Sequence, residues 1–414
     1  MRAGNPDVVV VGAGMAGSSI AAVLARGGAE VLLLERQREY RDRVRGEYMQ
    51  PWGVLEAQAL GLEDVIRSTQ AVDARYSVYY DELSVPAAAE EAKSDRSSTI
   101  FPGVRGGLCA SHPKACQALA EDAVRSGAEL VRGVTEVRVQ TGRRPSIAFL
   151  NGTEREVRPR LIIGADGRTS TVRRQSGIHL DEAPSTHVVA GLLVEGASQW
   201  PDDECTPGGV EGDLEFYVFP QGGGRLRLYT CHANGQATRW AGRAGAQRFV
   251  EAFAGLRSIP ESRGLGDARP AGPCGTFSGE QTWCDEPYAD GVVLLGDAGG
   301  YDDPVTGQGL SLAMRDVRQL SELLLASGDW TGATLRHYGE QRAERLRRMR
   351  RVSKTFAALM TTFTDAGRAR RDRFYAASSA GLQDVRMALG AMSRGPDRMP
   401  GEAFTDQLHE SLLA

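Results

Sequence analysis

A glycine-rich turn near the start of the chain constrains the fold more than any other feature of the sequence. Residues 12–17 read Gly-Ala-Gly-Met-Ala-Gly, which is a Gly-x-Gly-x-x-Gly pattern. The apolar run 7–11 before it predicts a buried strand, the segment 16–27 predicts a helix, and 30–35 predicts a second strand. Elements in this order form a βαβ unit, so we expect a parallel sheet with a right-handed crossover.

This turn predicts a dinucleotide-binding site. Gly12 permits the tight turn, Gly14 lets the backbone approach a pyrophosphate, and Gly17 lets the helix pack on the strand. The phosphates are expected at the helix N-terminus, where free N–H groups point outward. Glu35 ends the second strand 23 residues after Gly12, which suits a hydrogen bond to a ribose 2′-hydroxyl. The predicted cofactor-binding residues of the turn are Gly12, Ala13, Gly14, Met15, Ala16 and Gly17.

Length and composition limit the class of protein. The 414 residues are 41% hydrophobic and 25% charged, which suits a globular chain of two or three domains. The formal net charge is −4, whereas nucleic-acid-binding chains are normally basic, so no nucleic-acid partner is expected. No apolar run approaches the ~20 residues of a spanning helix, and no signal peptide is recognised, so we expect a cytoplasmic protein without stable membrane association. The cysteines and histidines are dispersed, and no metal site is predicted.

Two later segments each place an acid just after a predicted buried strand and beside glycines. The first is Gly164-Ala165-Asp166-Gly167, and the second begins with Gly296-Asp297 and ends with Gly307-Gln308-Gly309. Ligands bind at the carboxyl ends of strands in open α/β sheets. Asp297 is able to accept hydrogen bonds from a polyol, and residues 307–309 open a helix whose positive end would stabilise a reduced, anionic isoalloxazine.

The three motifs together resemble the single-component FAD-dependent monooxygenases of group A, the p-hydroxybenzoate hydroxylase-like family. The resemblance covers roughly residues 7–350. It implies that Glu35 binds the adenosine ribose, that Asp297 binds the ribityl chain, and that the backbone amides of 307–310 meet the pyrimidine edge of the flavin. It also implies that Asp166 supports both FAD and a transient nicotinamide cofactor. The cofactor-binding residues implied by these later motifs are Asp166, Gly296, Asp297, Gly307, Gln308, Gly309 and Leu310.

An arginine-rich loop follows the second predicted strand. Arg43-Val44-Arg45-Gly46 resembles the family's loop that meets the flavin and its pyrophosphate, so Arg45 and Arg36 are cofactor candidates. A solvated basic loop is the alternative interpretation. The sequence departs from the family at Gly300, where many members have His, and at Ser111-His112-Pro113, where the family often has Arg.

The expected fold is a Rossmann-like FAD-binding domain with an inserted antiparallel β-sheet substrate domain and a C-terminal helical segment. A single strand is predicted over 128–140, a hairpin turn at 221–224, and a loop over 86–98. The basic run 336–354 predicts a long helix with an exposed arginine face. The predicted domains are an FAD-binding domain (1–75, 100–185 and 275–350), a substrate domain (76–99 and 186–274) and C-terminal helices (351–414).

Aromatic side chains of the inserted domain are candidates for lining the substrate pocket. Strand alternation puts Tyr217 and Phe219 on one face and Phe216 and Val218 on the other. Sheet core is the alternative for any one of them, because strands favour aromatic residues. The predicted lining residues are Phe216, Tyr217, Phe219, Tyr229 and Trp283. The catalytic candidates are Arg45, Pro304, which the resemblance places near the flavin C4a, and Tyr217.

The resemblance implies hydroxylation by way of a flavin C4a-hydroperoxide, with FAD bound and NAD(P)H as transient co-substrate. The expected partners are O2 and an aromatic or polyketide-like small molecule. An epoxidase or Baeyer–Villiger-type oxygenase on the same scaffold is an alternative. A halogenase is another, although its Trp-x-Trp-x-Ile-Pro signature is absent. An NAD-dependent dehydrogenase would share only the first motif, and a non-catalytic FAD-binding protein is the remaining alternative.

Overall fold

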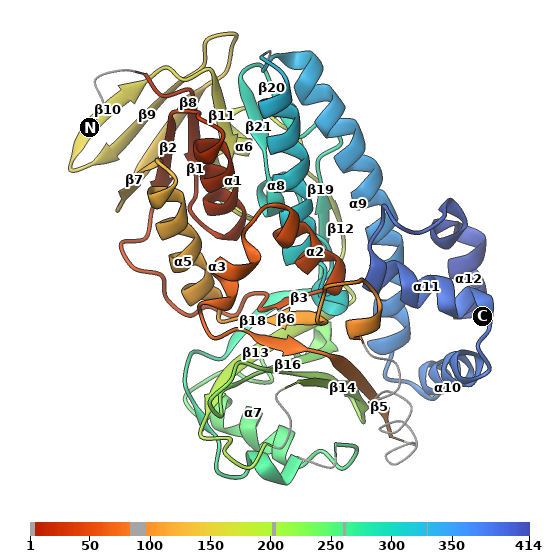
Figure 1. The fold of residues 1–414 in the computed structure, drawn as a ribbon. Helices are drawn as coiled ribbons and strands as arrows, with labels where there is room; N and C mark the ends of the chain where they lie inside the picture. Colours follow the sequence, from red (N-terminus) through yellow and green to blue (C-terminus); the bar gives the residue numbers. More distant parts are fainter. Residues whose placement is uncertain (1–4, 83–96, 201–203, 260–261, 329) are drawn as a thin grey trace.

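The structure of the chain is a computed structural model that describes residues 5–82, 97–200, 204–259, 262–328 and 330–414. Figure 1 shows an α/β part that contains the N-terminus, a second sheet at the opposite end, and a group of helices leading to the C-terminus along one side. Within the described residues, no helix is long and apolar enough to cross a membrane. Over the same ranges, no group of His, Cys, Asp and Glu side chains is arranged to hold a metal ion.

A parallel sheet forms the centre of the α/β part. Among the described residues it has six strands, of which only the edge strand β20 runs antiparallel to its neighbour. In spatial order the strands are β20 (Tyr288–Ala289), β21 (Val292–Leu294), β11 (Leu161–Gly164), β1 (Val8–Val11), β2 (Val31–Glu35) and β7 (Glu129–Arg132). The parallel pairing of β1 with β2 is the arrangement that the βαβ pattern predicted.

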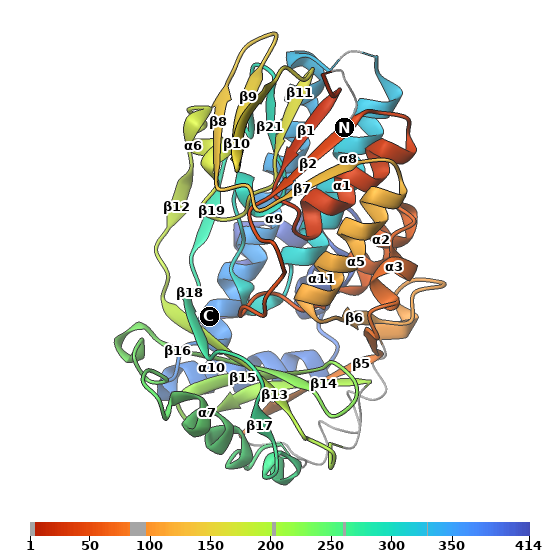
Figure 2. The same cartoon turned by 90° about the vertical axis from the view of Figure 1, so that its left-hand side faces the viewer.

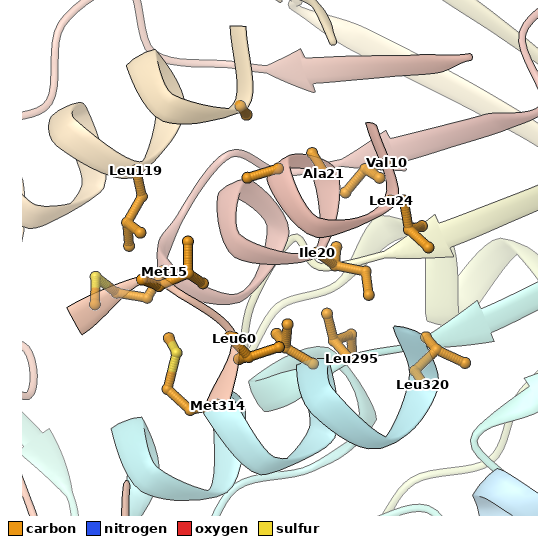
Figure 3. Close-up of a cluster of buried hydrophobic side chains, with 14 of the residues drawn as sticks. Val10, Met15, Ile20, Ala21, Leu24, Leu60, Leu119, Leu295, Met314 and Leu320 are labelled. Atoms are coloured by element: carbon orange, nitrogen blue, oxygen red, sulfur yellow. The ribbon is translucent and has the colours of Figure 1, made fainter. Parts of the chain in front are cut away.

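Helices cover one face of this sheet. They are α1 (Met15–Arg26), α5 (His112–Arg125) and α8 (Gly309–Ala326). Figure 3 shows Ile20 and Leu24 of α1 meeting Leu320 of α8 in one apolar cluster. Apolar residues at helical spacing thus explain why these segments are helices and which face each one buries.

The other face of the parallel sheet is covered by a small antiparallel sheet of β8 (Glu136–Gln140), β9 (Ser146–Asn151) and β10 (Thr153–Val157). The prediction of one strand over 128–140 is therefore wrong, because β7 and β8 belong to different sheets. Gly133 has a φ of 76° and ends β7. This left-handed conformation favours glycine and turns the chain out of the parallel sheet.

The larger sheet lies across the opposite end of the molecule (Figure 2). Its strands are β5 (Tyr76–Asp81), β13 (His187–Glu195), β14 (Cys205–Glu211), β15 (Leu214–Pro220), β16 (Leu226–Ala233), β17 (Arg269–Pro270) and β18 (Gly275–Ser278). The antiparallel pairing that the sequence predicted holds except at one edge, where β5 runs parallel to β14. Strand β14 is not predicted from the sequence, since its Pro207, Gly208 and Gly209 are typical of a turn.

The two faces of the larger sheet have different neighbours. Phe216 and Val218 are fully buried in a core that includes Phe249 of α7 (Gly245–Ala254). Tyr217 and Phe219 lie on the opposite face and pack against the Val189–Tyr229 cluster with Val44. The predicted alternation is confirmed, and Phe216 is corrected from pocket lining to sheet core.

Four α-helices follow α8 in the described part of the chain: α9 (Gly332–Met360), α10 (Asp365–Ser379), α11 (Gln383–Arg394) and α12 (Asp406–Leu413). The predicted arginine face of α9 is only partly exposed, because Arg342 and Arg345 are buried against Asp316 of α8. Arg347 of the same helix is exposed. The prediction is wrong for these two arginines, because their pairing with Asp316 of another helix cannot be read from the spacing of the basic residues.

The remaining helices and strands are short: α2 (Pro51–Ala59), α3 (Glu63–Arg67), α6 (Thr171–Gln175), β3 (Tyr48–Met49), β4 (Val72–Ala74), β6 (Gly107–Cys109), β12 (Asp181–Ala183) and β19 (Gln281–Trp283). Two 3-10 turns, η4 (Gly296–Gly299) and η5 (Pro304–Thr306), carry parts of the later motifs. Most of the predicted loop over 86–98 lies outside the described residues. The division of the chain into domains stays a prediction.

Candidate functional site

The glycines of the first motif have the conformations and neighbours that a dinucleotide-binding turn requires. Gly12 has a φ of 97°, and a Cβ on it would lie 2.5 Å from the Ala165 carbonyl oxygen. A Cβ on Gly17 would lie 1.8 Å from the Gly12 carbonyl oxygen, so α1 packs directly on the turn. A Cβ on Gly14 would meet nothing within 4 Å. The space at Gly14 is therefore free for a ligand, whereas Gly12 and Gly17 serve close backbone packing.

Glu35 lies at the end of β2 beside this turn. Its Oε2 accepts a hydrogen bond of 2.8 Å from the Ala13 N–H, and its Oε1 accepts one of 2.7 Å from the Gln37 N–H. These two bonds fix the carboxylate, and each oxygen keeps a second lone pair for a ligand hydroxyl. Met15 differs, because its side chain is buried in the core and does not line a binding site.

Asp166 caps the N-terminus of α6. It accepts hydrogen bonds from the Ser170 hydroxyl at 2.5 Å and from the Thr171 N–H at 2.6 Å at the start of α6. Arg173 of α6 is buried and donates to the Ala298 carbonyl at 2.8 Å. The second motif is thereby joined to the third.

The third motif is held by a buried ion pair between α8 and α9. Asp316 accepts from the Gly296 N–H and from the Arg342 Nε, at 3.2 and 2.8 Å. Arg342 also donates to the carbonyl oxygens of Gly296, Gly299 and Gly300. Neither residue is predicted from the sequence as part of the site, since neither lies within a motif. Together they fix the backbone on which Asp297 stands.

Asp297 and Arg45 lie close together in a charged part of the site. Asp297 is partly exposed and its Oδ2 lies 3.6 Å from the Arg168 Nε. Burial lowers the pKa of Arg45, an effect that Asp297 opposes and Arg168 reinforces. Burial, with the charge of Arg45, lowers the pKa of His112 to about 4. At neutral pH the His112 imidazole is therefore uncharged. It lies in the segment where the resembled family often has Arg.

A cavity of about 390 Å³ joins the first two motifs. Its wall includes the predicted cofactor-binding residues Gly12, Gly14, Glu35, Arg36, Arg45 and Asp166. Arg45 extends toward the second motif, because its Nη1 would lie 3.9 Å from a Cβ on Gly167. Its neighbour Gly46 approaches the third motif, where a Cβ would lie 3.8 Å from Leu310 Cγ. The loop that carries Arg45 thus connects all three motifs.

The N-terminus of α8 is the other candidate binding element. Gly307 has a φ of 63°, and Gly309 is exposed, so that a Cβ on it would meet nothing within 4 Å. The Gln308 side chain is buried, accepting from Trp52 Nε1 and donating to the Thr306 and Met392 carbonyls. No side chain caps this helix. Its first N–H groups are therefore available to a negatively charged ligand, while the Gln308 side chain has a packing role.

Aromatic rings of the larger sheet gather next to η5. The Tyr217 hydroxyl lies 3.1 Å from the carbonyl oxygen of Val305, the residue after Pro304. Tyr217 stacks with Phe219 at 6.0 Å between ring centroids, and Phe219 stacks with Tyr48 at 5.2 Å. Tyr217 and Phe219 are predicted from the sequence, whereas Tyr48 is not, because its place depends on the small sheet of β3 and β6.

The other predicted lining residues differ in their surroundings. Tyr229 is buried and its hydroxyl lies 2.6 Å from Glu47 Oε2. Trp283 lies under the guanidinium of Arg350, 4.1 Å from the ring centroid. Tyr229 therefore belongs to the region between the arginine-rich loop and the sheet, and Trp283 packs toward α9.

The sequence matches the model of a family described as an FAD-binding domain over residues 5–353. Digeranylgeranylglycerophospholipid reductase 2 of Methanococcoides burtonii is 27% identical over 349 residues, which cover 80% of this chain and 78% of that protein. Squalene monooxygenase SE1 of Panax ginseng is 28% identical over 352 residues, which cover 78% of this chain. The matched part is only 59% of that monooxygenase.

Solved structures share the fold over nearly the whole chain. The p-nitrophenol 4-monooxygenase of Pseudomonas putida DLL-E4 superposes with a TM-score of 0.76 at 18% identity, covering 95% of this chain and 99% of that one. A flavin-dependent brominase superposes with a TM-score of 0.74 at 16% identity, covering 98% and 97%. At these identities the likeness establishes a common architecture.

Proposed function

The chain is a member of the FAD-binding domain family, and on that premise we propose that it is a monooxygenase that hydroxylates an aromatic or polyketide-like small molecule. The membership agrees with the resemblance seen in the three motifs, and FAD is the cofactor of this oxidoreductase. Beyond the family and the cofactor, we propose that the reaction is a hydroxylation, that NAD(P)H is the reductant, and that the substrate is aromatic or polyketide-like.

One observation carries the proposal: the aromatic face of the larger sheet meets the third motif at η5. Tyr217 on β15 is hydrogen-bonded to Val305, between Pro304 and the glycine-rich start of α8. A substrate on this face would therefore lie beside the residues that we expect to hold the flavin ring. A dehydrogenase with only the first motif has no use for this arrangement.

The residues present fit FAD. Open positions at Gly14 and Gly309 allow a ligand to approach the backbone at both ends of the site, and Glu35 and Asp297 carry acceptors for its hydroxyl groups. Bound FAD would supply a redox-active ring that takes electrons from NAD(P)H and passes them to dioxygen. The protein binds the phosphates at α1 and stabilises negative charge at α8. The rings of Tyr48, Tyr217 and Phe219 exclude water from the substrate side.

The test uses the purified chain reconstituted with FAD. We expect flavin absorbance, NAD(P)H oxidation that an aromatic ligand accelerates, and incorporation of one oxygen atom from isotopically labelled dioxygen into that ligand. A colourless protein after reconstitution contradicts the cofactor assignment. Flavin binding without ligand-stimulated oxidation contradicts the enzymatic proposal.

Two further arms of the same assay address other activities. Squalene is tested because the monooxygenase from Panax ginseng is 28% identical, and an epoxide would redirect the proposal toward alkenes. Bromide is added because the brominase shares the fold, and a halide-dependent product would redirect it toward halogenation.

A further inference from the structure

A buried imidazole connects the larger sheet to the third motif. His187 begins β13, and its side chain is completely buried. Its Nε2 lies 3.2 Å from Oδ1 of Asp303, which is also buried and directly precedes η5. A Cβ on Gly279 would lie 2.3 Å from the same nitrogen, so a side chain there would displace the ring. Neither member of this pair lines the cavity of the first two motifs.

Asp303 also fixes the start of η5. Its Oδ1 accepts a hydrogen bond of 3.0 Å from the Val305 N–H, so the oxygen that caps the turn is the one that faces His187. The turn η5 contains Pro304 and leads through Gly307 into α8, whose N-terminus no side chain caps. A shift of Asp303 would therefore be passed on to the backbone amides that we expect to meet the flavin.

The pair depends on charge more than on a directed hydrogen bond. Although the His187 Nε2 is close to Asp303, it makes no hydrogen bond of good geometry among the described residues. A neutral imidazole gains little from this arrangement, whereas a protonated imidazole is strongly attracted to a carboxylate in a low-dielectric interior. By contrast, the hydrogen bonds from Ser353 and Tyr217 to η5 join uncharged groups. A single proton on His187 therefore changes how firmly η5 is held.

Several titratable groups lie around His187. They are Asp303 and Asp302 before η5, Glu215 of β15, and Cys231 and His232 of β16. Burial lowers the pKa of His187, but Asp303 and the fully buried Glu215 outweigh burial and raise it above its ordinary value of 6.5. Burial raises the pKa of both Glu215 and Asp302 to about 7. At pH 6.5 His187 is thus mostly protonated, with Asp303 facing it.

We infer that His187 is a positioning residue for the flavin: through Asp303 it holds η5 and the N-terminus of α8 where their amides meet the cofactor. The inference needs FAD, which the family establishes, and goes beyond the proposed function because it is independent of the substrate and of the reaction. A helix N-terminus stabilises the negative charge that the ring gains on reduction. Loss of the imidazolium should therefore weaken the binding of reduced FAD more than that of oxidised FAD.

The test measures the midpoint reduction potential of FAD bound to the purified protein, by spectroelectrochemical titration. His187→Gln keeps a hydrogen-bonding side chain but cannot carry a charge. At pH 6.5 we expect the equilibrium constant for flavin reduction to fall about tenfold, which for two electrons makes the potential about 30 mV more negative. The affinity for oxidised FAD, measured by fluorescence titration, should change by about threefold or less.

The dependence on pH separates charge from shape. The imidazolium contributes fully below pH 6.5, and its contribution is lost as pH rises through the higher pKa of His187 in the folded protein. The difference in potential between wild type and His187→Gln should therefore be largest at about pH 6 and vanish at about pH 9. It should persist when Glu215→Gln or Asp302→Asn is placed in both proteins, because His187 and Asp303 carry it.

A second variant and a control define the pair. Asp303→Asn keeps an acceptor for the Val305 N–H but removes the charge, so we expect the same loss of potential. This variant keeps the test valid if His187→Gln fails to fold. The double variant should lose no more than either single variant, because the two residues act as one pair. His179→Gln is the matched control: its side chain is 83% exposed and lies 3.3 Å from Asp181, and its loss should leave the potential unchanged.

A merely structural role of His187 would lower the thermal stability of the apoprotein and leave the potential of the bound flavin unchanged, and this result overturns the inference. It is also overturned if the loss of potential is equal at about pH 6 and about pH 9, or if the two substitutions are additive. Oxygen transfer with an unchanged potential would reject this inference alone. A potential that depends on His187 without oxygen transfer would reject only the monooxygenase.

Discussion

At the scale of single residues, the three glycines of the first motif serve different purposes. Gly12 and Gly17 have no space for a side chain, because backbone atoms lie at 2.5 and 1.8 Å from a Cβ position. Gly14 has open space and an ordinary φ of −73°. The protein itself therefore tolerates a side chain at Gly14, and only a ligand excludes it.

The substitution Gly14→Val tests this difference. We expect the variant to fold with a free energy of unfolding within about 1 kcal/mol of wild type, but to bind FAD at least about tenfold more weakly. Flavin fluorescence titration and thermal unfolding of the apoprotein measure the two quantities. Gly17→Val is the matched control, and we expect it to fold poorly. Normal FAD affinity in Gly14→Val would contradict the placement of the phosphates.

The raised pKa of Glu215 makes a prediction about stability and pH. Its ordinary pKa is 4.5 and burial raises it to about 7, so the folded state holds a proton between these values that the unfolded state releases. The contribution of Glu215 to the free energy of unfolding therefore falls as pH rises from 4.5 to 7, by roughly 2–3 kcal/mol.

Denaturant unfolding of wild type and Glu215→Gln at several pH values measures this contribution. Glutamine does not titrate, so the variant should gain stability relative to wild type as pH rises across that window. Parallel curves for the two proteins would show that the carboxyl titrates normally.

At the scale of elements, the segment that holds the third motif in place is α9, which lies outside the motif itself. Arg342 pairs with Asp316 and donates to three carbonyl oxygens of residues 296–300. Both side chains are almost completely buried. A charge in such a position is stable only with its partner, so the helix and the motif depend on each other.

We expect Arg342→Met to lower the free energy of unfolding by about 3 kcal/mol or more and to weaken FAD binding, because Asp316 loses a partner and the loop loses its donors. Arg347→Ala in the same helix is the control. Loss of its exposed ion pair with Glu344 should lower the free energy of unfolding by about 0.5 kcal/mol or less. Equal effects of the two substitutions on thermal unfolding would refute the buried role of Arg342.

The arginine-rich loop is the second element with a predicted function. Arg45 lines the cavity of the first two motifs, and its loop reaches Leu310 of α8. We expect Arg45→Ala to weaken FAD binding and to slow reduction by NAD(P)H, since a positive charge beside the phosphates and the flavin is lost. Arg105→Ala, an exposed arginine outside that cavity, is the control. Titration measures the FAD affinity, and rapid mixing measures the rate of reduction. If both quantities are unchanged in the Arg45 variant, the result favours a merely solvated loop.

At the scale of the whole molecule, the C-terminal helices close one side of the substrate face. Arg371 of α10 donates to Asp81 of β5 at 2.8 Å, and both side chains are buried. Tyr375 of α10 lies 5.9 Å from Tyr79 between ring centroids. The last helices are thereby fixed to the edge of the larger sheet, next to the rings proposed to meet the substrate.

Replacing Arg371 with Met should lower the free energy of unfolding by about 3 kcal/mol, because it leaves the buried Asp81 carboxylate without its cation. FAD binding should change little, since the cofactor candidates lie in the α/β part. Arg373→Ala, at an exposed position of α10, should be neutral. Loss of flavin from the Arg371 variant would show that the two ends of the molecule are coupled.

The sequence by itself determined the features that depend on short-range spacing. Gly12 and Gly17 specify a tight turn because of their own backbone freedom and size, and Tyr217 and Phe219 share a face because strand side chains alternate. The family and the cofactor followed from three such local patterns. Only the tertiary structure decided that Arg342 is buried against Asp316 and that the Tyr217 hydroxyl meets the Val305 carbonyl of η5. The cause is physical: a charge is stable in the interior only beside a partner, and folding brings that partner from a distant part of the chain.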